Sequence, residues 1–270
     1  MRDILSVMRG IRRFSALALC ALSPLAGQDW ARQRLDQSPR HQEWAQIKHD
    51  GRVVHAFVVY PEVKHKAAAV VVIHENQGLT DWVRGVADQL AAAGHIAVAP
   101  DLLSGMAPGG GRTSDFGEAG GAREAIYKLR PEQVTADLNA VTDYVKKLPA
   151  ASGKVAVAGF CWGGTQSFRF AASRPDLAAA FVFYGTGPES VAGIRAPVYG
   201  FYGGNDARVN ATVPQSAELM KQAGLRFEAV TYEGAGHGFM RAGEEPGAGE
   251  ANRKAREEAW RRWLGLLGKM

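Results

Sequence analysis

Cysteine is nearly absent from this sequence of 270 residues, in which only Cys20 and Cys161 occur. Two cysteines are too few for a disulfide-stapled scaffold, or for a zinc site built from several thiolates. The seven histidines include no pair spaced four residues apart, the spacing that places two metal ligands on one face of a helix. We therefore expect a protein that requires no metal and no cofactor.

Long hydrophobic runs are missing as well, because no apolar stretch approaches the roughly 20 residues that a membrane-spanning helix requires. The excess of positive charge is small, with 32 Lys and Arg against 27 Asp and Glu, a net charge of +5. Residues 1–27 carry four arginines and one aspartate, a net charge of +3. Residues 28–270 therefore have a net charge of only +2. No basic stripe is interleaved with aromatic residues, so we expect neither a membrane span nor a nucleic-acid partner.

The N-terminal segment has the pattern of an export signal. Residues 1–14 are basic, residues 16–22 form a short apolar stretch, and the small residues of 23–27 follow. We predict a signal peptide over residues 1–27 and export to the periplasm or medium of a bacterium. The alternative is an amphipathic N-terminal helix on a cytoplasmic protein.

From residue 41 onward, the pattern alternates between strands and helices. Residues 53–60 favour an early antiparallel strand, and residues 69–73 are a β-branched run typical of a strand buried on both faces. Further strands are expected at 96–100, 155–158, 180–184, 198–202 and 227–232, and helices at 132–148, 161–172, 213–223 and 252–267. This order predicts a mostly parallel central sheet with helices on both faces. We expect residues 28–270 to form a single domain of this α/β class.

Cys161 lies in the segment Gly-Phe-Cys-Trp-Gly-Gly, directly after the strand at 155–158 and before a helix. Gly-x-Cys-x-Gly between a strand and a helix is the nucleophile-elbow pattern with cysteine in place of serine. The turn is strained, and the glycines leave room for it. Because Cys161 would sit at a helix N-terminus, we expect the helix dipole to favour its thiolate. A buried, inert cysteine is the competing interpretation.

A histidine and an acid follow the cysteine in the chain order that such a catalytic triad requires. His237 is the only histidine after Cys161, and it comes just after the last predicted strand. Asp206 follows another apolar strand, whereas Asp176 lies at a helix end and suits the surface. We therefore predict a triad of Cys161, His237 and Asp206.

The loop after the strand at 69–73 reads His-Glu-Asn-Gln-Gly. In enzymes with this elbow, a backbone N–H of that loop and the N–H after the nucleophile form the oxyanion hole. The two donors are predicted to be Asn76 and Trp162. A carboxylate at Glu75 beside such a hole is unusual, and it suggests a side chain that exchanges a proton with the Cys161 thiol.

These motifs together resemble the dienelactone hydrolase (carboxymethylenebutenolidase) family, over roughly residue 50 to the C-terminus. The resemblance implies the α/β-hydrolase fold and assigns to Glu75 the removal of the thiol proton when substrate binds. It also implies that Arg123, Tyr127 and Arg241 bind an anionic substrate. Arg123 and Tyr127 are four residues apart, which would place them on one helix face.

The sequence therefore predicts a cysteine-dependent hydrolase of esters or lactones, acting on a small molecule that carries a negative charge. Two alternatives remain: a carboxylesterase of broad specificity on the same triad, or a catalytically silent binding protein. We expect a monomer or a homodimer.

Overall fold

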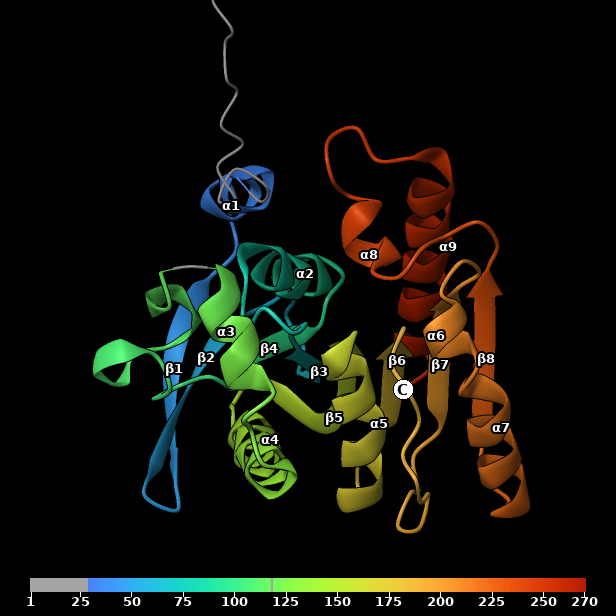
Figure 1. Ribbon diagram of the computed structural model, residues 1–270. Coiled ribbons are helices and arrows are strands. Elements are labelled where there is room, and N and C mark those ends of the chain that lie inside the picture. Colours follow the sequence, from blue (N-terminus) through green and yellow to red (C-terminus); the bar gives the residue numbers. More distant parts are fainter. Residues whose placement is uncertain (1–28, 118) are drawn as a thin grey trace, which may run out of the picture.

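The structure is a computed structural model that describes residues 29–117 and 119–270. The signal peptide predicted over residues 1–27 therefore lies outside the described residues. A single sheet of eight strands runs through the molecule (Figure 1), in the order β1-β2-β4-β3-β5-β6-β7-β8. The strands are β1 (Gln42–His49), β2 (Arg52–Val59), β3 (Ala67–Ile73), β4 (Ile96–Asp101), β5 (Ala151–Phe160), β6 (Ala179–Phe183), β7 (Val198–Gly203) and β8 (Phe227–Tyr232).

The sheet is antiparallel only at its N-terminal end. β2 pairs antiparallel with both β1 and β4, and every other neighbouring pair is parallel. Parallel strands all point their carboxyl ends to one edge, so the loops that follow β3 to β8 gather there. This arrangement confirms the predicted mostly parallel sheet.

Helices cover both faces of the sheet, as Figure 1 shows. They are α1 (Asp29–Asp36), α2 (Asp81–Ala92), α3 (Ala119–Ile126), α4 (Pro131–Lys146), α5 (Trp162–Ser173), α6 (Ala207–Asn210), α7 (Val213–Gln222), α8 (Phe239–Ala242) and α9 (Glu250–Leu267), with short 3-10 turns at Pro108–Gly110 and Thr113–Asp115. Side chains of α2 and α9 pack in one apolar cluster, and those of α4, α5 and α7 pack in a second.

The strand sequences explain why two clusters form. Along β3, Val70 and Val72 belong to the first cluster, whereas Val71 and Ile73 belong to the second. Successive side chains of a strand point to opposite faces, so a continuous apolar run fills both layers at once. Such a strand is stable only with helices on each side.

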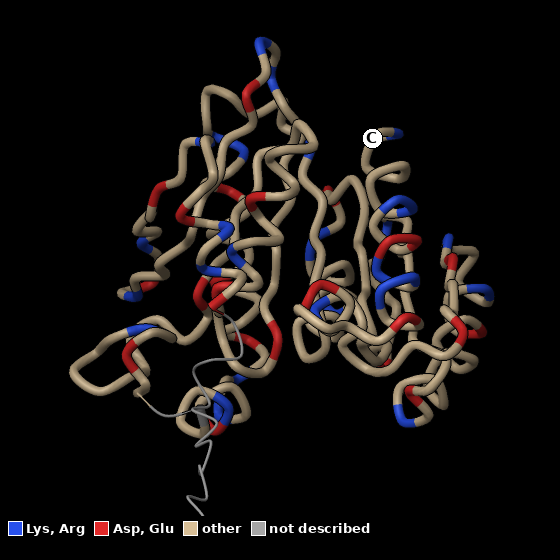
Figure 2. The backbone as a smooth tube through the Cα atoms, turned by 90° about the horizontal axis from the view of Figure 1, so that it is seen from above, with Lys and Arg blue, Asp and Glu red and all other residues tan. Residues whose placement is uncertain are grey.

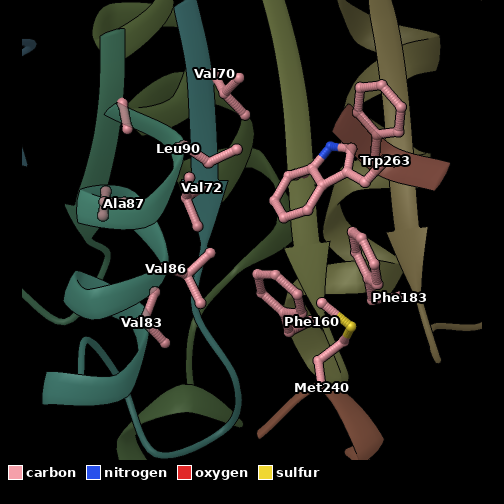
Figure 3. Close-up of a cluster of buried hydrophobic side chains, with 14 of the residues drawn as sticks. Val70, Val72, Val83, Val86, Ala87, Leu90, Phe160, Phe183, Met240 and Trp263 are labelled. Atoms are coloured by element: carbon pink, nitrogen blue, oxygen red, sulfur yellow. The ribbon is translucent and has the colours of Figure 1, made fainter. Parts of the chain in front are cut away.

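The first cluster contains three packed aromatic side chains alongside the carboxyl end of β5 (Figure 3). The ring of Phe160 stacks on that of Phe183 at 4.7 Å between centroids, and Phe183 meets the edge of Trp263 at 4.8 Å. All three side chains are fully buried. Since Phe160 immediately precedes Cys161, this packing fixes the backbone from which the cysteine projects.

Charged residues of both signs are interspersed on the helices. Blue and red segments alternate along the C-terminal helix α9 in Figure 2, as its sequence requires. Its buried residues Ala255, Ala259, Trp263 and Leu267 recur every four positions, which gives the helix one apolar stripe. None of the described helices combines the length and the apolar character that crossing a membrane needs.

Four elements differ from the expectations. β1 precedes the first expected strand, and its side chains are mostly half-exposed, which weakens its apolar signal. α3 begins at Ala119, inside a glycine-rich stretch that looks irregular in sequence. The short helices α6 and α8 hold only four residues each, too few for a visible periodicity.

Candidate active site

Cys161 is the single residue between strand β5 and helix α5. Its backbone has φ 55° and ψ −116°, and positive φ is uncommon for a residue with a side chain. The strained turn is held on both sides, because the Cys161 N–H donates to the Phe183 carbonyl at 3.0 Å and its own carbonyl accepts the Thr165 N–H at 3.2 Å. The turn therefore presents the thiol at the carboxyl edge of the sheet.

The glycines around Cys161 are required by close backbone contacts. A Cβ on Gly159 would lie 1.9 Å from the Gly163 carbonyl oxygen, and a Cβ on Gly163 would lie 2.4 Å from that of His74. No side chain fits at such distances. The missing side chains let the elbow approach the end of β3, and so bring Cys161 next to the loop that carries Glu75.

Asp206 and His237 meet at the same edge of the sheet. Asp206 follows β7 and His237 follows β8, and the Asp206 Oδ2 lies 2.5 Å from the His237 Nδ1. A carboxylate can only accept, so the hydrogen is on Nδ1, and Nε2 remains free to take a proton. The Asp206 side chain is 6% exposed, and its Oδ1 also accepts the Val209 N–H at 3.4 Å. This second bond fixes the carboxylate plane.

The surroundings of Cys161 favour the neutral thiol. Burial raises the pKa of Cys161, and the negative charge of Glu75 raises it further. A hydrogen bond from the Trp162 N–H and the charge of Arg208 oppose this rise without cancelling it. The helix N-terminus thus acts in the expected direction through the Trp162 N–H, but desolvation and a nearby carboxylate outweigh it, so the net preference for the thiolate is not found. Among the described residues, no hydrogen bond joins the thiol to His237.

Glu75 is half-buried at the end of β3 and has two partners. Its Oε2 accepts a hydrogen bond from the Arg241 Nε at 3.2 Å, and its Oε1 accepts one from the Tyr184 hydroxyl at 3.4 Å. Burial raises the pKa of the Glu75 carboxyl, while the Arg241 charge counteracts the rise. Arg241 also pairs with Glu245, so its charge is shared between two carboxylates.

The two predicted oxyanion donors lie on adjoining segments. Trp162 is the first residue of α5, and Asn76 lies in the loop after β3, whose backbone touches the start of that helix at Gly163. Within the part of the chain that the structure describes, no acceptor bonds to the Asn76 N–H. An unpaired amide beside the nucleophile is what an oxyanion hole requires.

The other two predicted binding residues, Tyr127 and Arg123, differ in how close the structure places them to the Asn76 loop. Tyr127 is 64% exposed, and its hydroxyl accepts a hydrogen bond from the Asn76 side-chain amide at 3.3 Å, so it borders the same loop. It follows the end of α3 at Ile126, so only Arg123 lies within the helix itself. Arg123 is exposed and forms no ion pair with any described residue.

Sequence reasoning missed two side chains of this site. Tyr184 follows β6 with φ 41°, is 1% exposed, and meets the His237 ring edge-on at 5.1 Å. Arg208 lies on α6, two residues after Asp206, exposed and without an ion-pair partner among the described residues. The signal for both was their place in a segment that follows a strand of the parallel sheet, Tyr184 directly after β6 and Arg208 five residues after β7.

No group of three or more His, Cys, Asp or Glu side chains within residues 29–117 and 119–270 is arranged to hold a metal ion. The functional groups at this edge are a thiol, an Asp–His pair, a half-buried carboxylate and the backbone amides of Asn76 and Trp162. These groups suit acyl transfer to sulfur.

Comparison with known proteins identifies relatives over most of the chain. The model of the dienelactone hydrolase family matches residues 54–270. A Salmonella typhimurium protein assigned as a carboxymethylenebutenolidase is 32% identical over 237 residues, covering 81% of this chain and 83% of the relative. The carboxymethylenebutenolidase of Pseudomonas putida is 32% identical over 201 residues, covering 72% and 83%.

A solved structure has the same fold. The crystal structure of a protein assigned as a dienelactone hydrolase from Klebsiella pneumoniae has a TM-score of 0.73 at 24% identity, covering 86% of this chain and 99% of that one. This similarity confirms the α/β-hydrolase fold. Because the family model extends from β2 to the C-terminus and the fold agrees with it, the chain belongs to the dienelactone hydrolase family and is a hydrolase of ester or lactone bonds.

Proposed function

We propose that the protein hydrolyses a small, negatively charged lactone or ester through a covalent thioester on Cys161. The observation that carries this proposal is the convergence of a strained cysteine elbow with the Asp206–His237 pair at one edge of the sheet. A nucleophile on such a turn, at the same sheet edge as a histidine oriented by a carboxylate, matches the requirements of nucleophilic catalysis.

Glu75 has the role of taking the thiol proton. In the resting protein the Arg241 guanidinium holds the pKa of the Glu75 carboxyl below the value that burial alone would give. An anionic substrate competes for that guanidinium, so Glu75 loses the ion pair and becomes a stronger base. It then removes the proton from the neighbouring thiol, and a thiolate forms only when substrate is bound.

The reaction then proceeds in two steps. The Cys161 sulfur attacks the carbonyl carbon, the C–O bond to the leaving oxygen breaks, and this oxygen takes the proton held by Glu75. The Asn76 and Trp162 N–H groups stabilise the negative oxygen of the tetrahedral intermediate. In the second step the His237 Nε2 takes a proton from water, the hydroxide attacks the thioester, and the departing sulfur regains that proton.

The charge of the substrate can be tested by comparing two substrates, a dienelactone and p-nitrophenyl acetate. In Arg123→Ala we expect kcat/KM for the dienelactone to fall about 10- to 100-fold, the value of a hydrogen bond to a charged group. Neutral p-nitrophenyl acetate should be hydrolysed at the parent rate. Arg241→Ala should slow the dienelactone as well, but it should not slow p-nitrophenyl acetate, because loss of the ion pair leaves Glu75 a stronger base.

Arg169→Ala is the matched control, since it removes the same charge from an exposed position of α5. Equal losses on both substrates in Arg123→Ala would favour the carboxylesterase of broad specificity. A wild-type protein that hydrolyses neither substrate would instead support the silent binding protein.

We further propose that the chain is exported, on the strength of its basic and apolar N-terminal residues. Mature protein isolated from its host should then begin near Gln28, which intact-mass spectrometry can determine. An N-terminus at Met1 on the native protein would contradict export.

A further inference from the structure

The His74 side chain is fully buried between the end of β3 and the loop after β4. Its Nδ1 lies 2.8 Å from the Glu75 carbonyl oxygen, and its Nε2 lies 3.3 Å from the Leu102 nitrogen. The Leu102 N–H can only donate, so Nε2 must be the acceptor and the hydrogen of the neutral ring is on Nδ1. His74 therefore donates to the Glu75 carbonyl. Burial lowers the pKa of His74, in agreement with a neutral ring.

This hydrogen bond fixes the direction of a neighbouring amide. The carbonyl of Glu75 and the N–H of Asn76 belong to one planar, trans peptide group, in which they point in opposite directions. Holding the carbonyl toward the buried ring turns the N–H away from it. The Gly78 N–H also bonds to this carbonyl, but at the longer distance of 3.3 Å.

The same ring contacts the second predicted donor residue. The His74 imidazole stacks on the Trp162 indole with 5.6 Å between centroids and 14° between planes. The backbone oxygen of His74 also lies where a Cβ of Gly163 would clash. His74 thus touches both segments that carry the predicted donor amides, the loop after β3 and the first turn of α5.

We propose that His74 is a positioning residue that sets the oxyanion hole, because it orients the Asn76 N–H through the Glu75 carbonyl. The proposal rests on the proposed function, in which these amides receive the negative oxygen. His74 does not touch the substrate, so its effect is on the stabilisation of the transition state and not on substrate binding.

Two substitutions separate the hydrogen bonds of the ring. In His74→Asn the amide nitrogen takes the place of Nδ1, so the donor to the Glu75 carbonyl is kept and the Leu102 bond is lost. In His74→Gln the amide oxygen takes the place of Nε2, so the Leu102 bond is kept and the donor to Glu75 is lost. Both variants lose the imidazole ring and its stack on Trp162, which makes each the control of the other.

With p-nitrophenyl acetate, we expect kcat of His74→Gln to fall about 10- to 100-fold, less than the roughly 10²- to 10³-fold cost of deleting an oxyanion donor. KM should stay within about twofold of the parent value. His74→Asn should keep kcat within about threefold, because it preserves the bond that orients the amide. Alkylation of Cys161 by iodoacetamide forms no oxyanion, so both variants should react at the parent rate.

Equal kcat in the two variants, or a lower kcat in His74→Asn, would overturn the proposal. A loss of alkylation rate in His74→Gln that parallels its loss of kcat would also overturn it, since the defect would then lie in the thiol. The turnover of Cys161→Ala, measured in the same assay, distinguishes a failure of the proposed function from a failure of the positioning role of His74. If that variant retains turnover, the proposed function fails regardless of His74.

Circular dichroism and the thermal unfolding midpoint establish whether both variants fold. If either does not, the wild-type protein still provides a test through ¹⁵N NMR of labelled histidine. The buried ring that shows a contact to Trp162 should be neutral, protonated at Nδ1 and unchanged between pH 6 and pH 8. A hydrogen on Nε2 of that ring would overturn the proposal.

Discussion

Cys161→Ala is expected to abolish hydrolysis, with a loss in kcat of about five orders of magnitude or more, the scale of removing a covalent nucleophile. Alanine has the same Cβ and lacks only the sulfur, so the elbow at φ 55° and the packing of Phe160 below it should be unaffected. The measurement is kcat/KM for p-nitrophenyl acetate and for a dienelactone, with circular dichroism to show that the variant folds.

Cys161→Ser is the companion variant. A hydroxyl is far less acidic than a thiol, so Glu75 cannot ionise it and little activity should remain. Turnover at the parent rate in Cys161→Ala would assign catalysis to another residue. Parent activity in Cys161→Ser would contradict the proposed transfer of the thiol proton to Glu75.

Asp206→Asn is expected to lower kcat by about 10⁴-fold, the cost known for the same change in a serine triad. The amide would donate to His237 where the carboxylate now accepts, which places the imidazole hydrogen on Nε2. That nitrogen could then no longer take a proton from water. The remaining carbonyl oxygen can still accept the Val209 N–H, so the fold should tolerate the change.

Asp176→Asn is its matched control, because Asp176 is the other aspartate between Cys161 and His237. It is exposed and pairs with Lys146 and Arg174 at the surface, where an ion pair contributes about 1 kcal/mol or less. We expect its kcat to be unchanged. A similar loss of kcat in both variants would mean that Asp206 does not act on His237.

The sequence predicted the sheet well because its central strands are buried on both faces. A run such as residues 69–73 can be stable only between two layers, and the structure places it in β3 (Ala67–Ile73). Cys161, Asp206 and His237 could be singled out because each follows such a strand, and the carboxyl ends of parallel strands share an edge. The structure indeed brings Asp206 and His237 within 2.5 Å.

What the sequence could not predict depends on contacts between distant segments. The pair of Glu75 and Arg241 joins residues 166 positions apart, and no local pattern signals it. The direction of the Cys161 pKa shift was missed for the same reason, since burial and the Glu75 charge exist only in the folded protein. The contacts of His74 and Tyr184 likewise arise from packing between strands that are separated in the chain.

The raised pKa of Cys161 has a consequence for the lifetime of the enzyme. Peroxides and other oxidants attack the thiolate, and repeated oxidation leads to sulfinic and sulfonic acids, of which the second cannot be reversed. Burial and the neighbouring carboxylate keep the sulfur protonated while the site is idle. The reactive thiolate is therefore not exposed to oxidants between turnovers. Burial and the Glu75 carboxylate, which tune the reactivity of Cys161, also set how long the enzyme survives in oxidising surroundings.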